Sequence, residues 1–93
     1  MNAALKELIS RYLEEPDNVE VIHRIRKLRA GEADFSDEVF ESFGAESRRR
    51  IYAALLLWTD PTNTKRILQR RANSEVDSQC NARLQFMISN WPP

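Results

Sequence analysis

Several residue types are scarce in this chain of 93 residues, which has two glycines, one cysteine and one histidine. Two glycines leave little room for tight hairpins or for glycine-rich phosphate loops. The single cysteine, Cys80, forms no internal disulfide, and with His23 it falls short of the four ligands of a usual zinc site. We therefore expect no disulfide framework, no metal centre and no cofactor, and a reducing cytoplasm is the expected compartment.

Long apolar runs are also absent. The longest covers residues 53–58, far short of the roughly 20 residues that span a bilayer. Lys6 and Glu7 interrupt the first apolar residues too early for a secretory signal. The sequence therefore predicts neither a membrane span nor secretion.

No catalytic motif stands out. His23 has no serine or cysteine motif around it, and Cys80 lies on an apolar stripe, which favours a small buried thiol. Glu38 and Glu41 lie one helical turn apart, as a carboxylate pair would, but a solvated helix face also explains them. We predict that the chain is not an enzyme, and we assign no catalytic residue.

Apolar residues recur at helical spacing along the whole chain. Leu5, Leu8, Ile9, Tyr12 and Leu13 form a stripe on one face of a first helix, which Pro16 interrupts. Further helices with their caps are expected over residues 17–31, 36–44, 45–59, 60–73 and 74–91. The helix over 45–59 is apolar over a wide arc, which is typical of a central helix. The prediction is an all-α fold, a compact single domain over residues 1–93 with five to six short helices.

Capping signals mark several helix ends. Asp17 followed by Glu20 resembles a capping box, and Gly31 suits the C-cap of the same helix. Phe35 and Phe40 flank the expected N-cap Ser36 at the spacing of a hydrophobic staple.

The last two helices have similar signals. Asp60 followed by Pro61 predicts a cap and a first-turn proline. Ser74, with Asp77 three residues later, predicts the start of the last helix, and Val76 then falls on its buried stripe. The residues that we expect in the core are large and apolar: Leu8, Tyr12, Ile22, Ile25, Phe40, Ile51, Leu55, Trp58, Leu68, Leu84 and Ile88.

Charge is distributed unevenly, although the net formal charge is zero. Residues 1–46 contain eleven acidic and six basic side chains, a balance of −5, and residues 47–93 contain three acidic and eight basic ones, a balance of +5. Most of the basic residues are arginines, whose planar guanidinium pairs with carboxylates and phosphates. Such a chain can present a positive face to a partner.

Three consecutive arginines, Arg48, Arg49 and Arg50, fan over about 200° of the surface of their helix. Two interpretations stay open. The arginines pair inside the chain with the acidic residues 37–41, as surface ions commonly do, or they bind a partner.

The second basic cluster comprises Lys65, Arg66, Arg70 and Arg71 on the expected helix 60–73. Gln69 lies beside them, and arginine and glutamine are side chains that pair with base edges. A very short turn joins this helix to the preceding one, which permits a helix-turn-helix arrangement. The helix is either the solvated outer face of the bundle or a nucleic-acid-binding element.

Trp91 either seals the bundle or anchors a partner. Our leading hypothesis is a non-catalytic protein-interaction module, a regulator or inhibitor that docks on an acidic surface of a larger protein. The alternative is nucleic-acid binding through helix 60–73, and oppositely charged halves also permit self-association. The expected partner-binding residues are Arg48, Arg49, Arg50, Lys65, Arg66, Gln69, Arg70, Arg71 and Trp91.

Overall fold

A computed structural model of the chain describes residues 3–93. Over these residues the secondary structure consists of helices and their connections, without a strand. The helices are α1 (Ala3–Glu14), α2 (Val19–Lys27), α3 (Asp37–Glu41), α4 (Ala45–Trp58), α5 (Pro61–Ser74) and α6 (Ser78–Ser89). The principal extents are 30, 26 and 24 Å, so the helices form a compact bundle. The all-α prediction with up to six short helices is confirmed.

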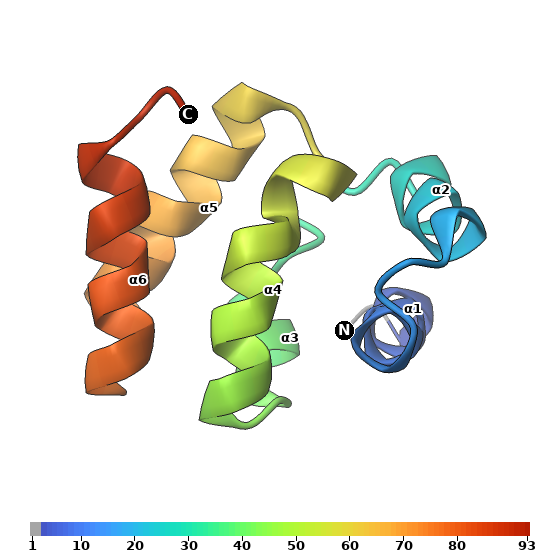
Figure 1. The fold of residues 1–93 in the computed structure, drawn as a ribbon, viewed down its shortest axis with the longest axis horizontal. Helices are drawn as coiled ribbons and strands as arrows, with labels where there is room; N and C mark the ends of the chain where they lie inside the picture. Colours follow the sequence, from blue (N-terminus) through green and yellow to red (C-terminus); the bar gives the residue numbers. More distant parts are fainter. Residues whose placement is uncertain (1–2) are drawn as a thin grey trace.

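The central position belongs to α4, as its wide apolar arc predicts. It contacts α1 and α2 on one side and α5 and α6 on the other (Figure 1). In that view α4 and α6 run upward, and α5 runs downward between them on the far side. The near sides of α4 and α6 therefore form one face of the molecule.

Two helices begin at the predicted N-caps. Asp60 caps α5, because its carboxylate accepts a hydrogen bond of 2.8 Å from the backbone N–H of Asn63. Ser36 has the extended backbone of an N-cap, although its side chain makes no capping hydrogen bond. The rings of Phe35 and Phe40 lie 6.2 Å apart, so the predicted staple holds the entry to α3.

The predicted ends of α2 are each displaced. Asn18 caps the helix in place of Asp17, and its side chain accepts a 3.1 Å hydrogen bond from the backbone N–H of Glu20. Both residue types are good N-caps, so the sequence does not separate the two positions. The helix ends at Lys27, before Gly31, and the residue with positive φ is Arg29, at 53°.

The start of α6 was also predicted too early. Asp77 is its N-cap and accepts a 2.9 Å hydrogen bond from the backbone N–H of Cys80, whereas Ser74 ends α5. Val76 lies in the connection and is 92% exposed. Its predicted burial is wrong because the residue is not part of the helix whose period placed it in the core.

The core contains residues from every helix. Seven of the eleven expected core residues are buried, and Leu8, Tyr12, Ile22 and Ile88 pack against them while partly buried. Trp58 lies at the centre of an aromatic group, with its ring stacked 6.0 Å from that of Phe35. Within the part of the chain described, no helix combines the length and apolar content needed to cross a membrane.

Candidate functional site

Two of the arginines predicted to bind a partner lie inside the protein. Arg71 is 0% exposed and Arg48 is 9% exposed. The Nε and Nη2 atoms of Arg48 donate to Oε1 and Oε2 of Glu75, each at 2.9 Å. This two-pronged pair joins α4 to the connection between α5 and α6, and the planar guanidinium suits it.

Arg71 completes a buried network with Arg48, Tyr52 and Glu75. Its Nε donates to the hydroxyl of Tyr52 at 2.9 Å, and that hydroxyl donates to Oε1 of Glu75 at 2.6 Å. The remaining donors of Arg71 bind two carboxylates of α3, Asp37 at 3.1 Å and Glu41 at 2.9 Å. The network therefore fastens α3, α4 and α5 to one another.

Hydrogen bonding fixes the charge states of this network. Burial alone would raise the pKa of Glu75, but hydrogen bonds from Arg48 and Tyr52 lower it to about 2. Burial and the hydrogen bond to Glu75 raise the pKa of Tyr52. Burial disfavours the charge of Arg71, but its hydrogen bonds to Tyr52, Asp37 and Glu41 outweigh burial and raise its pKa. At neutral pH, Glu75 is ionised and the tyrosine is a donor.

The prediction that Arg48 and Arg71 belong to a partner-binding face is therefore corrected. Their donors are directed inward, because a buried guanidinium has to be paired. The expected contact with residues 37–41 does form, but Arg71 makes it in place of the three consecutive arginines.

Arg70 and Arg50 are also used within the chain. Arg70 is half-buried, donates to the carbonyl oxygens of Glu32 and Phe35, and lies 3.5 Å from the carboxylate of Asp37. Arg50 is exposed and donates to the carbonyl oxygen of Leu13 at 2.9 Å. The Arg70 bonds connect α5 to the segment before α3, and the Arg50 bond connects α4 to α1. Arg50 forms no salt bridge within residues 3–93, so its exposed charge is not paired there.

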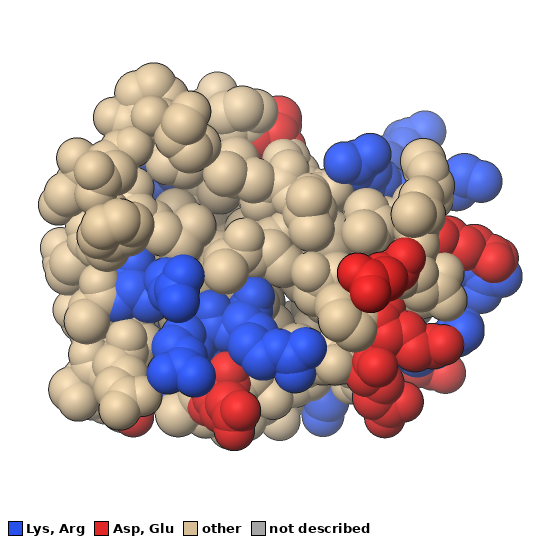
Figure 2. Space-filling view, in the orientation of Figure 1, with Lys and Arg blue, Asp and Glu red and all other residues tan. Residues whose placement is uncertain are grey.

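Five residues line a shallow surface hollow of about 480 Å³ between α4 and α6: Arg49, Gln79, Ala82, Arg83 and Phe86. We call them the α4–α6 face. Neither arginine forms a salt bridge with any residue in the range 3–93. Phe86 is 66% exposed. Figure 2 shows basic side chains gathered over the lower parts of these two helices, beside uncharged surface.

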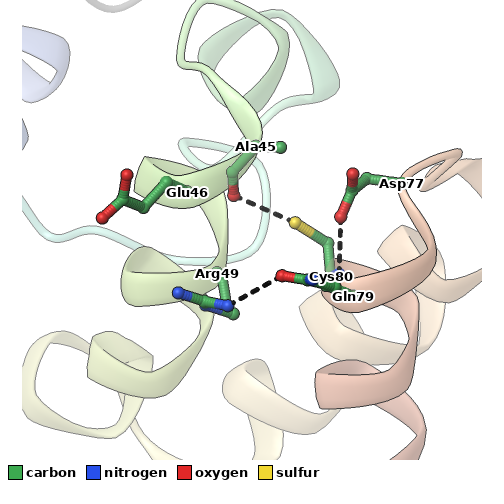
Figure 3. A pocket seen from close by; sticks show the side chains of 6 residues that line it. All are labelled: Ala45, Glu46, Arg49, Asp77, Gln79 and Cys80. Carbon is green, nitrogen blue, oxygen red and sulfur yellow. Dashed lines mark hydrogen bonds between the residues drawn. The ribbon is translucent and has the colours of Figure 1, made fainter.

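A smaller hollow of about 170 Å³ adjoins this face (Figure 3). The thiol of Cys80 lies at its base, 1% exposed, with Sγ 3.0 Å from the carbonyl oxygen of Ala45, to which it donates. Burial raises the pKa of Cys80 to about 11, so the thiol stays protonated at neutral pH. Arg49 donates to Oε1 of Gln79 at 3.0 Å across the opening. The hollow thus holds a protonated thiol and no activated nucleophile.

The α5 face is a separate surface. Lys65, Arg66 and Gln69 are exposed there and line a hollow of about 300 Å³ with the partly buried Trp91. Neither cation has a salt-bridge partner in the described chain. Residues 3–93 also contain no group of three or more His, Cys, Asp or Glu arranged to hold a metal ion.

The structure therefore separates the predicted residues. Arg48 and Arg71 lie in the interior, Arg49 lies on the α4–α6 face, and Arg50 and Arg70 bind carbonyl oxygens of the chain. The α5 face has the remaining four, which are Lys65, Arg66, Gln69 and Trp91. Sequence reasoning missed Gln79, Arg83 and Phe86. A signal for them exists, because positions 79, 82, 83 and 86 follow helical spacing and form a second stripe on α6, opposite the apolar one.

No protein-family model, curated protein or solved structure matches this chain.

Proposed function

We propose that this protein is a non-catalytic interaction module that docks on an acidic surface of a larger protein through the α4–α6 face. One observation carries the proposal: two arginines that form no salt bridge within residues 3–93 line a hollow together with a phenylalanine that is 66% exposed. Arginine and aromatic residues are enriched in protein interfaces and dominate their binding energy.

Each component of the face favours a complex. Full burial of a phenylalanine side chain is worth about 1.5–3 kcal/mol, and Phe86 leaves most of its ring in water until a partner covers it. Arg49 and Arg83 supply planar donors for carboxylates, which would set the orientation of the partner. The buried network fastens α4 to α3 and α5, and α6 packs against both α4 and α5, so little order has to be gained on docking.

A rigid bundle blocks whatever surface it covers, and in this way a small regulator or inhibitor can act without chemistry of its own. The single cysteine is a free thiol, which suits a reducing compartment. We propose that the docking takes place in the cytoplasm.

The test is affinity capture with the tagged protein, with and without nuclease, followed by measurement of the dissociation constant for the purified partner. We expect R83A/F86A to weaken binding by about 30-fold, because loss of a hot spot costs about 2 kcal/mol. K65A/R66A on the α5 face is the matched control and should bind as the wild type does. Unchanged affinity of R83A/F86A would contradict the proposal.

The α5 face favours a second candidate function, nucleic-acid binding. Lys65 and Arg66 are exposed, have no salt-bridge partner among the residues described, and lie beside Gln69. Phosphates would bind the cations, and the amide would contact a base edge. In this case nuclease would abolish capture, and K65A/R66A would lose binding where R83A/F86A would not.

A further inference from the structure

A second charged surface lies where α1 passes into α2. Residues 14–20 contain four carboxylates, and no lysine or arginine occurs between Arg11 and Arg24. Val19, in the middle of this segment, is 61% exposed. We call this segment the acidic corner; its carboxylates are Glu14, Glu15, Asp17 and Glu20.

Only part of this negative charge is balanced locally. Glu20 pairs with Arg24 at 2.9 Å, and Glu15 lies 3.8 Å from Arg11 in a contact that water screens. Glu14 and Asp17 are exposed and have no salt bridge to any residue described. The acidic corner thus resembles the α4–α6 face with the opposite sign, since each has charges without a salt bridge in residues 3–93 and one large exposed apolar side chain.

The two surfaces are visible from the same side of the molecule. In Figure 2 basic side chains gather over α4 and α6 on the left, above a smaller acidic group, and acidic side chains gather over α1 and the start of α2 on the right, with further basic side chains above and beside them. They lie at similar heights in this view. Because both belong to one rigid face, neither can fold back to cover the other.

We infer that two copies of this chain pair through this face as a closed twofold dimer, with the α4–α6 face of each copy on the acidic corner of the other. The twofold axis lies in the plane of the face, between the two patches. Rotation by a half-turn about this axis places the α4–α6 face of each copy on the acidic corner of the other, so opposite charges meet at both contacts. Twofold pairing of this kind is the commonest form of oligomer. Phe86 and Val19 supply apolar surface that charges alone would lack.

The inference does not depend on the proposed docking partner. It adds that the docking face is covered in the dimer, so a second copy and an acidic partner compete for Arg49 and Arg83. A monomer would then be the form that docks.

The test is sedimentation equilibrium of the purified chain. At ~0.1 M salt we expect a mass twice the 10.9 kDa of the monomer, and at ~1 M salt, where charges are screened within about 3 Å, the monomer mass. K65E/R66E, which makes the same change of net charge on the α5 face, should leave the dimer intact.

Two reversals of charge make the test specific. R49E/R83E places acid against acid at both contacts, and E14K/D17K places base against base, so each variant alone should be monomeric. A one-to-one mixture restores opposite charges at both contacts and should give the dimer mass. Circular dichroism of each variant confirms that the helices are retained.

The inference would be overturned if the wild-type chain were a monomer at concentrations on the order of 1 mM. At that concentration even a dissociation constant of about 1 mM would give substantial pairing. A dimer that survives R49E/R83E, or a mixture that stays monomeric, would also overturn it. None of these results bears on docking to an acidic partner, which is measured separately with that partner.

Discussion

Replacing Glu75 with glutamine tests whether the buried network holds the bundle together. Glu75 accepts hydrogen bonds from Arg48, Tyr52, Arg71 and the backbone N–H of Asp77. The neutral amide keeps the shape but leaves the guanidinium of Arg48, 9% exposed, without its counter-charge. Breaking a buried ion pair in this way costs about 3–5 kcal/mol, a large share of the about 5–15 kcal/mol that stabilises a typical domain.

The assay is urea unfolding followed by far-ultraviolet circular dichroism. A loss of about 3 kcal/mol corresponds to a midpoint lower by ~2 M when the urea dependence is ~1.5 kcal/mol per molar. The control is E38Q, which removes an exposed carboxylate of α3 and should change the free energy of unfolding by less than about 0.5 kcal/mol. A loss below about 1 kcal/mol for E75Q would refute the reasoning.

A double substitution separates the cost of an unpaired charge from that of a changed shape. R48M/E75Q removes the guanidinium that E75Q leaves without a counter-charge, while the amide oxygen at position 75 can still accept from the Tyr52 hydroxyl, so it should destabilise less than E75Q alone. A double variant that is less stable than E75Q would show that the pair itself, and not the unpaired arginine, determines the cost.

Three further predictions concern acid, thiol reactivity and capping. The pKa of Glu75 falls from 4.5 to about 2 on folding. Its stabilising effect is thus complete above pH 4.5 and is lost as the pH falls toward 2. The free energy of unfolding of the wild type should fall across this range, and that of E75Q should lack this part of the fall. Identical pH profiles for the two proteins would contradict the prediction. Cys80 should react with a thiol reagent at pH 8 far more slowly in the native protein than in urea, and equal rates would show that it is accessible. In thermal unfolding, D60A should lower the free energy of unfolding by about 1 kcal/mol and S36A by a few tenths. The reason is that the side chain of Asp60 makes a capping hydrogen bond and that of Ser36 does not. Equal losses in the two variants would contradict this.

Much of the fold was predictable because its determinants are local. Helical spacing of apolar residues placed most of the core, and the Asp60–Pro61 pair fixed the start of α5. Where two good caps lie close together, as Ser74 and Asp77 do, local chemistry does not choose between them. The misplaced burial of Val76 follows from that ambiguity.

The buried network was harder to predict because its contacts are distant in the sequence. Arg48 and Glu75 lie 27 residues apart, and Tyr52 and Arg71 lie 19 apart. Only the packing of α4 beside α5 brings them together. The sequence did hold a local indication. Arg48 and Tyr52 are one helical turn apart, and so are Arg71 and Glu75. Each pair therefore places its polar groups on one side of its helix.

The candidate binding face was predictable only in part. Arg49 was identified from the three consecutive arginines, but only the tertiary structure shows that Arg48 faces inward and Arg49 outward. Arg83 is isolated in the sequence, and Phe86 is one apolar residue among several in α6. They belong to the candidate face because they line one hollow with Arg49, which the periodicity of one helix does not reveal.

The central claim is that the arginines of residues 47–93 divide into an interior set that stabilises the fold and a surface set that is left for binding. Urea unfolding of R71Q and R83Q, measured side by side, tests it most directly. We predict that R71Q loses about 3–5 kcal/mol, because it removes a buried charge that binds Tyr52 and three carboxylates, those of Asp37, Glu41 and Glu75. R83Q should stay within about 0.5 kcal/mol of the wild type. Equal losses in the two variants, or a stable R71Q, would contradict the division.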